Sequence, residues 1–324
     1  MKRSYRWGIL GAGRIAEKFC TALCFTEGAE VYAIASRDPG RARQYAGQFR
    51  ATKWYDSYDA LVKDDNVDIV YIATPHAFHF EQVMLCLDHH KPVLCEKPMS
   101  LNYVQTSAMI VRATEKELFL MEGIWTRFMP FLEKMLDLIR QDAIGIPLYV
   151  NADFGFAAPK NAEGRLFNSA LGGGAVLDIG VYCIFLSTLL FGQPVAIQSF
   201  SQIGETGVDE YANMIMQFNE GTTAHLLASL VFSTALEVEV IGSKGRIKVH
   251  CPWYKATEFT LYPPGGQPEV FSFPHACNGF EYEIAEVMQC LDKGFLQSQK
   301  MTHALSLSIS KTMDAVLLQA GVPR

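Results

Sequence analysis

A charged pair follows an apolar run at residues 93–99, which read VLCEKPM. The run 93–95 is typical of the end of a buried strand, where the following loop ordinarily begins with Gly, Asn or Ser. A buried lysine can act as a general base when its surroundings depress its pKa toward neutrality. Lys97 is therefore a candidate proton-transfer group, with Glu96 as its partner and Pro98, in a cis peptide, as a brace for the turn. The alternative is a surface lysine beside a loop proline.

A second cluster lies at residues 171–182, which read LGGGAVLDIGVY. Three consecutive glycines let the chain pass close to a ligand. Asp178 and Tyr182 stand at positions i and i+4, so they share one face of the helix that follows. An acid and a phenol on one face can bind substrate hydroxyls or relay a proton. In the alternative interpretation, Asp178 caps the helix and Tyr182 fills the core.

The segment 11–16 reads GAGRIA and follows the first predicted strand. Gly11 permits a tight turn, and Gly13 lets the backbone approach a pyrophosphate. Arg14 and Ile15 then open a helix whose N-terminal N–H groups favour phosphate. The pattern predicts a dinucleotide site, with a plain glycine turn or a methyl-donor site as alternatives.

The tip of the second predicted strand reads Ser36-Arg37-Asp38. A guanidinium at this position favours the 2′-phosphate of NADP, with Ser36 and Arg41 assisting. Asp38 is a rival ligand for the ribose of NAD. It is also a suitable N-cap for a helix that begins at Pro39. The sequence therefore predicts NADP, with NAD as the alternative.

A later strand leads into residues 74–79, which read TPHAFH. We expect Thr74 to cap a helix that begins at Pro75, with His76 and His79 in its first turn. Carboxyl ends of strands are where doubly wound sheets bind ligands, so these residues are predicted to contact cofactor or substrate. A metal site is disfavoured because no third ligand lies nearby in sequence. Histidines at a helix N-terminus are expected to resist protonation.

These motifs require a sheet edge to position them. In the first 125 residues, short β-rich runs alternate with helical periodicity, which predicts a doubly wound parallel sheet. The predicted strands are 7–10, 31–35, 67–73, 92–95 and 118–122, and two of the predicted helices are 80–90 and 103–115. The first domain is predicted to cover residues 1–123.

Residues 124–324 are predicted to form a second, α+β domain with a large open, mostly antiparallel sheet. The expected strands are 148–156, 196–203, 211–218, 222–232, 236–241, 246–250, 259–262 and 270–273. Helices are expected at 131–141, 175–191, 281–291 and 303–319, the last of which could pack back on the first domain. Because no second layer of helices is apparent, we expect a homodimer that packs sheet on sheet.

The composition of the chain excludes some classes of binding partner. A net charge of −6, with 19% charged residues and no long run of one sign, argues against a nucleic-acid surface. The eight cysteines contain no CxxC pair, so we expect reduced thiols and no metal. No signal-peptide pattern is visible, and the most apolar tract, 183–191, is shorter than a membrane span. We therefore expect a cytoplasmic enzyme with a small-molecule substrate.

Together these motifs resemble the glucose-fructose oxidoreductase and inositol dehydrogenase (Gfo/Idh/MocA) family over essentially the whole chain. The resemblance is carried by GxGxxA, the His79 segment, Glu96-Lys97-Pro98 and the GGG-x3-D-x-G-x-Y block. The stretches 121–128, 177–183 and 205–209 resemble most closely the branch that acts on arene trans-dihydrodiols and D-xylose.

The resemblance implies a Rossmann domain and a dimer formed through the open sheet. It implies Lys97 as the main catalytic residue, with Asp178 and Tyr182 lining the substrate site, and with Trp125, Arg127 and Phe154 as further substrate contacts. We therefore expect an NADP-dependent dehydrogenase that oxidises a cyclic vicinal diol. The alternative is a non-enzymatic NADP sensor that binds a protein partner through its second domain.

Overall fold

The computed structural model describes residues 4–322, which fold as two compact units. The first unit comprises the described residues up to Trp125 together with Ala276–Ser306. The second comprises Thr126–His275 together with the described residues from Leu307 onward. The predicted boundary at 123/124 differs from this division by two residues, and the segment 276–306 was expected in the second domain.

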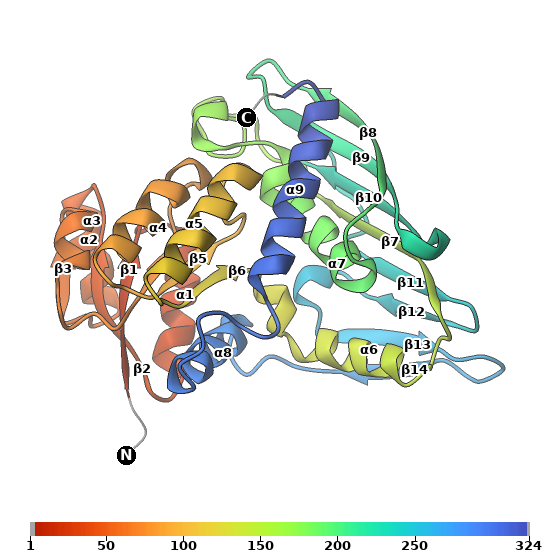
Figure 1. The fold of residues 1–324 in the computed structure, drawn as a ribbon, viewed down its shortest axis with the longest axis horizontal. Helices are drawn as coiled ribbons and strands as arrows, with labels where there is room; N and C mark the ends of the chain where they lie inside the picture. Colours follow the sequence, from red (N-terminus) through yellow and green to blue (C-terminus); the bar gives the residue numbers. More distant parts are fainter. Residues whose placement is uncertain (1–3, 323–324) are drawn as a thin grey trace. The chain divides into compact units, whose positions relative to one another are not determined.

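The first unit is built on a parallel sheet in the order β3-β2-β1-β4-β5-β6 (Figure 1). Its strands are β1 (Tyr5–Leu10), β2 (Ala29–Ala35), β3 (Lys53–Tyr55), β4 (Ile69–Ile72), β5 (Val93–Glu96) and β6 (Leu120–Gly123). The order reverses between β1 and β4, so the carboxyl ends of the strands form a ligand-binding edge. The predicted doubly wound fold is confirmed.

Among the described residues, five helices connect these strands: α1 (Arg14–Phe25), α2 (Pro39–Gln48), α3 (Tyr58–Val62), α4 (His79–Asp88) and α5 (Tyr103–Glu115), with the 3₁₀ turn η1 (His76–Phe78) before α4. The unit also contains α8 (Phe280–Asp292), which follows the last described strand of the chain. Side chains of Asp38, Ser57 and Asn102 accept first-turn N–H groups of α2, α3 and α5, as expected of N-caps.

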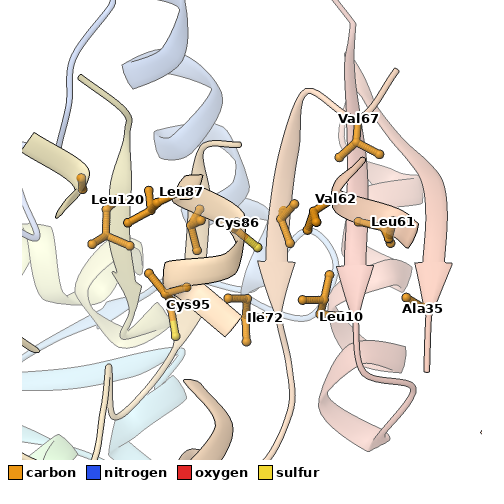
Figure 2. Close-up of a cluster of buried hydrophobic side chains, with 14 of the residues drawn as sticks. Leu10, Ala35, Leu61, Val62, Val67, Ile72, Cys86, Leu87, Cys95 and Leu120 are labelled. Atoms are coloured by element: carbon orange, nitrogen blue, oxygen red, sulfur yellow. The ribbon is translucent and has the colours of Figure 1, made fainter. Parts of the chain in front are cut away.

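An apolar cluster joins one face of this sheet to its helices (Figure 2). Leu10, Ile72 and Cys95 project from adjacent strands and meet Leu61 of α3 and Leu87 of α4, all with no exposed surface. Burial of this apolar surface stabilises the sheet and fixes the position of each strand end relative to its neighbours. The loops after β1, β4 and β5 are therefore held on a rigid base.

The second unit contains a sheet in the order β14-β13-β12-β11-β7-β10-β9-β8 (Figure 1). Its strands are β7 (Pro147–Gly155), β8 (Ala196–Ile203), β9 (Asp209–Gln217), β10 (Thr223–Ser229), β11 (Val238–Gly242), β12 (Arg246–Val249), β13 (Glu258–Tyr262) and β14 (Glu269–Ser272). Among the described strands of this second sheet, only β7 and β10 pair in parallel. The predicted open, mostly antiparallel sheet is confirmed.

One face of this second sheet is covered by helices (Figure 1). The helices are α6 (Pro130–Arg140), α7 (Val181–Phe191) and α9 (His303–Gln319). The boundary between the two units falls inside α9, after residue 306. Five short helical turns of the described chain accompany them: η2 (Trp125–Phe128), η3 (Ser169–Leu171), η4 (Val176–Gly180), η5 (Asn219–Gly221) and η6 (Trp253–Lys255). The other face exposes Phe200 of β8, Ile215 of β9 and Val270 of β14. Alternation along the strands thus leaves one face partly apolar and uncovered by the described helices.

The apolar tract 183–191 forms the end of the helical run that was predicted at 175–191. Together with the helical turn before it, Ser169–Phe191 spans 23 residues, and its most apolar window has a mean hydropathy of 2.0, which meets the length and composition of a membrane span. However, 83% of its most apolar window is buried within the protein. Burial of this extent is typical of a core helix.

Candidate active site

The loop after β1 has the geometry of a phosphate-binding turn. Gly11 adopts φ +99°, and a Cβ there would lie 3.0 Å from the carbonyl oxygen of Ala73. Gly13 is the N-cap of α1 and supplies no side chain to the first-turn N–H groups. Apart from its neighbours in the chain, no described residue comes within 4 Å of the position that a Gly13 Cβ would take. The turn is therefore open where a pyrophosphate would bind, and the residues fit a dinucleotide.

The residues predicted to bind the cofactor at the tip of β2 have two different environments: the arginines are exposed, and Asp38 caps a helix. Arg37 is exposed, and its guanidinium carbon lies 4.7 Å from the centroid of the Phe78 ring. Asp38 accepts a hydrogen bond from the backbone N–H of Arg41 at 3.2 Å and caps α2. Ser36 accepts the backbone N–H of Asp38 at 3.1 Å. The cap interpretation of Asp38 is confirmed, and Arg37 and Arg41 remain exposed at the cofactor edge.

The loop after β4 differs from the prediction in detail. The helix α4 begins at His79 after one 3₁₀ turn, and Thr74 donates its hydroxyl to the Gln82 side chain at 2.6 Å. Thr74 is thus bonded to a side chain inside α4, and Pro75 precedes the 3₁₀ turn. His76 is buried, with its ring centroid 5.8 Å from that of His79.

His79 connects two loops of the first unit. Its Nδ1 lies 2.8 Å from the carbonyl oxygen of Pro98, and its Nε2 lies 2.9 Å from the carbonyl oxygen of Thr74. Burial lowers the pKa of His79, although these carbonyls oppose the shift. Both ring nitrogens face backbone carbonyls, so His79 is a brace between the loops after β4 and β5, and its contact with the cofactor stays a prediction.

The end of β5 places Lys97 at the same edge. The Lys97–Pro98 peptide is cis, as predicted, and Lys97 is half-buried directly after the fully buried strand. Glu96 accepts the Tyr71 hydroxyl at 2.5 Å and the backbone N–H of Lys97 at 3.3 Å. The carboxylate of Glu96 is thereby fixed by donors from β4 and from the turn itself.

A second carboxyl lies behind Glu96. Glu283 of α8 has no exposed surface, and neither of its carboxyl oxygens has a hydrogen-bond partner among the described residues. Burial, and then the charge of Glu96, raise the pKa of Glu283 well above its usual range. Burial also raises the pKa of Tyr71, and the charge of Glu96 reinforces this shift. This arrangement favours a neutral Glu283 beside a charged Glu96.

Trp125, at the end of the first unit, stacks on a residue that the sequence did not single out. Its ring lies 4.4 Å from that of Phe280, with an interplanar angle of 21°. Phe280 is the first residue of α8 and is 1% exposed. No local spacing connects positions 125 and 280, because the contact depends on α8 folding onto the first unit.

The second unit gathers a separate aromatic group. Phe154 of β7 stacks on Tyr254 of η6, with ring centroids 4.3 Å apart and an interplanar angle of 9°. The Tyr182 ring lies 5.6 Å from Phe154 and 5.9 Å from Tyr254. Phe154 and Tyr182 therefore lie close together in the second unit, and Tyr254 is a third aromatic ring, which the sequence did not single out.

Asp178 lies one turn before Tyr182, inside a π-helical turn. It is 4% exposed, and its carboxylate accepts the guanidinium of Arg165 at 2.5 Å. The turn is held by Asp209, which accepts the backbone N–H of Val176 at 2.6 Å. A Cβ at Gly173 would lie 2.7 Å from the carbonyl oxygen of Leu166, which explains a glycine in this loop. Asp178 is thus a hydrogen-bond acceptor fixed by Arg165, and the side chain that caps the helical turn is that of Asp209.

Arg127 has a different partner from the one predicted. It is 8% exposed, and its guanidinium lies 2.5 Å from the carboxylate of Glu133 in the first turn of α6. This ion pair fixes η2 to α6 within the second unit. The predicted substrate contact of Arg127 stays a prediction beside this ion pair.

The predicted site residues thus form two groups. The first unit holds the cofactor turns, Lys97 with its carboxyl neighbours, and Trp125. The second unit holds Phe154, Asp178 and Tyr182.

Known proteins share both halves of the chain. Residues 5–124 match the oxidoreductase family with an NAD-binding Rossmann fold, and residues 132–248 match the GFO/IDH/MocA C-terminal domain. Trans-1,2-dihydrobenzene-1,2-diol dehydrogenase of Xenopus tropicalis is 34% identical over 98% of both chains. The human protein of that name is 33% identical over 98% of this chain and 97% of its own.

A solved structure is also similar. A 3-ketoreductase from Actinomadura kijaniata, in complex with NADP and TDP-benzene, has a TM-score of 0.89. It is 27% identical and covers 98% of both chains.

The first unit combines a Rossmann sheet, an open phosphate turn after β1 and a lysine after β5. These features are those of an NAD(P)-dependent dehydrogenase. The chain belongs to the GFO/IDH/MocA oxidoreductase family. The predicted family and enzyme class are confirmed, and the alternative of a non-enzymatic sensor is not supported.

The neutral acid at position 283 predicts a pH-dependent stability. Because folding raises the Glu283 pKa, its contribution is fully present below the unfolded pKa and is lost as pH rises toward the folded pKa. Relative to Glu283→Gln, the wild type should lose about 1.4 kcal/mol of unfolding free energy per pH unit within that window. Denaturant unfolding from pH 5 to 9 measures the difference.

The exposed Glu258→Gln is a matched control, because it makes the same change at the surface. A difference between wild type and Glu283→Gln that stays constant with pH would show that Glu283 titrates normally.

Proposed function

We propose that the protein is an NADP-dependent dehydrogenase that oxidises a cyclic vicinal diol, either an arene trans-dihydrodiol or an aldose such as D-xylose. The observation that carries the proposal is Lys97, half-buried after β5 at the same strand-end edge as the open turn at Gly11. A secondary alcohol loses a hydride only as its hydroxyl proton leaves, so a basic amine at this edge has a direct use.

The chain's own residues support NADP over NAD. Gly11, Gly13 and the N-terminus of α1 would hold the pyrophosphate, and Arg37 with Arg41 would hold a 2′-phosphate. Asp38 is committed to capping α2, which removes the carboxylate that an NAD site would use for the ribose. When bound, the nicotinamide ring accepts the hydride. The name of the similar ketoreductase complex, which contains NADP, supports the same choice.

On the substrate side, the second unit offers an apolar wall and polar acceptors. The stacked rings of Phe154 and Tyr254 suit a flat arene or the apolar face of a sugar. Asp178 and Tyr182 would bind the two hydroxyls or relay their protons, with Lys97 as the main proton acceptor. That both units act on one substrate is proposed from the family resemblance, and the names of the dihydrodiol dehydrogenase relatives support the diol.

The uncovered face of the second sheet supports a homodimer. Phe200, Ile215 and Val270 are exposed on it, and a second copy would bury them by packing sheet on sheet.

Lys97→Met removes the proton acceptor while keeping a side chain of similar length. We expect NADPH formation from a panel of trans-dihydrodiols and aldoses to fall by about 10²- to 10⁴-fold, the usual contribution of general acid–base catalysis. NADP binding, measured by fluorescence titration, should persist. Turnover close to that of the wild type would overturn the role of Lys97.

Arg37→Ala should weaken the enzyme's use of NADP selectively. Loss of a charge-assisted hydrogen bond is worth about 1.5–3 kcal/mol, so KM for NADP should rise roughly ten- to a hundredfold, with little change for NAD. Arg43→Ala, an exposed arginine of the same helix, is the control. Equal increases of KM for both cofactors would refute the 2′-phosphate assignment.

Phe200→Glu places a charge on the proposed dimer face. We expect the wild type to sediment as a dimer and the variant as a monomer, because burying an unpaired carboxylate is unfavourable. Phe25→Glu, at another exposed phenylalanine, should leave the dimer intact. A monomeric wild type would end the dimer proposal.

A further inference from the structure

Glu122 occupies the strand next to Lys97 and is 2% exposed. It lies in β6 opposite Cys95 of β5, and the following residue pairs with Glu96. One carboxyl oxygen accepts the backbone N–H of Met99 at 2.9 Å, two residues after Lys97. The other oxygen has no hydrogen-bond partner among the described residues. Glu122 therefore holds the far side of the turn that carries Lys97.

Charged and titratable neighbours face Glu122 from β5 and the turn after it. Burial raises the pKa of Glu122 to about 7, the charge of Glu96 adds to this shift, and the charge of Lys97 opposes it. The thiol of Cys95 lies on the same side, and burial with the charge of Glu122 raises its pKa well above the usual range.

The segment from α8 to the start of α9 also approaches β6. The hydroxyl of Ser306 interacts with the Glu122 carboxyl and lowers its pKa. The His303 ring bonds to the carbonyl oxygen of Leu120 at 2.9 Å, and burial lowers the pKa of that histidine. This segment therefore contributes a hydroxyl and a histidine whose lowered pKa favours the neutral form. The cation that lowers the pKa of Glu122 is Lys97.

We propose that Glu122 is a positioning residue for proton transfer at Lys97: its carboxyl anchors the backbone after the lysine, and its ionisation strengthens the hold of the Lys97 amine on its proton. The inference rests on the proposed function of Lys97. The anchoring follows from the bond to Met99, and the electrostatic effect follows from the interaction of the buried Glu122 carboxyl with the half-buried Lys97 amine. Their titrations are coupled, so the pH profile of the enzyme belongs to the pair.

Two variants separate the anchor from the charge. Glu122→Gln keeps an acceptor for the Met99 N–H but removes the charge, whereas Glu122→Met removes both at similar length. In Glu122→Gln, the acid limb of kcat/KM should move to lower pH by about one unit, because the amine then loses its proton more easily. In Glu122→Met, kcat should fall about tenfold, and Gln at this position should restore most of that loss.

The control is Glu115→Gln, an exposed glutamate of α5, which should leave the acid limb in place. An unshifted acid limb in Glu122→Gln would overturn the electrostatic part of the proposal. Equal kcat values for the Gln and Met variants would overturn the anchoring part. A purely structural role would lower kcat in Glu122→Met without moving the acid limb in Glu122→Gln.

A readout without turnover distinguishes this inference from the proposed function. Infrared spectroscopy should show a protonated carboxyl band that disappears as pH rises through about 7 and is absent from Glu122→Gln. If the band titrates but Lys97→Met remains active, the proposed function fails while the ionisation of Glu122 stands. If Lys97→Met is inactive but no such band titrates, the inference about Glu122 fails alone.

Discussion

The cost of burying charge at the carboxyl end of β5 governs the arrangement of the first unit. Glu96 is buried at the end of the strand, and Lys97 follows it. Two further buried carboxyls, those of Glu122 and Glu283, interact electrostatically with Glu96. Each is accommodated differently: Glu96 by the Tyr71 hydroxyl, Glu122 by the Met99 amide and Glu283 by keeping its proton. The result is a lysine beside Glu96, with Glu122, whose pKa is raised to about 7, and Glu283, which favours the neutral form.

Such an arrangement suits an amine that must take and give protons near neutral pH. A full set of ionised carboxylates would hold the lysine proton too tightly, and a purely apolar pocket would expel the charge. The parallel sheet supplies the rest, because it brings the turns after β1, β2, β4 and β5 to one edge. The ring of His79 then ties the last two of these turns together through their backbone carbonyls.

Much of this could be read from sequence because it is local. The glycine turn at Gly11, the cap at Asp38 and the cis proline after Lys97 depend on neighbouring residues and a strand–helix rhythm. The short edge strand β3 and helix α3 escaped prediction because each is too brief to show periodicity.

Long-range contacts could not be read in this way. Tyr254 on Phe154, Phe280 on Trp125 and Glu283 near Glu96 join residues more than 90 positions apart. The partners of His79 and Arg127 are nearer in sequence, 19 and 5 positions away for His79 and 6 for Arg127. These contacts nevertheless depend on the folding of the intervening turns, which residue spacing does not give. Residue type and spacing indicated which side chains could do chemistry, and only the packing shows which of them also brace the turns.

The most direct test of the central claim is chemical rescue of Lys97→Ala by small primary amines. If the Lys97 amine accepts the hydroxyl proton, added amines should restore NADPH formation from the best diol, and the restored rate should follow the concentration of free base. If the variant binds NADP and substrate but no amine restores turnover, or if it is fully active without one, the assignment of Lys97 as the proton-transfer group is contradicted.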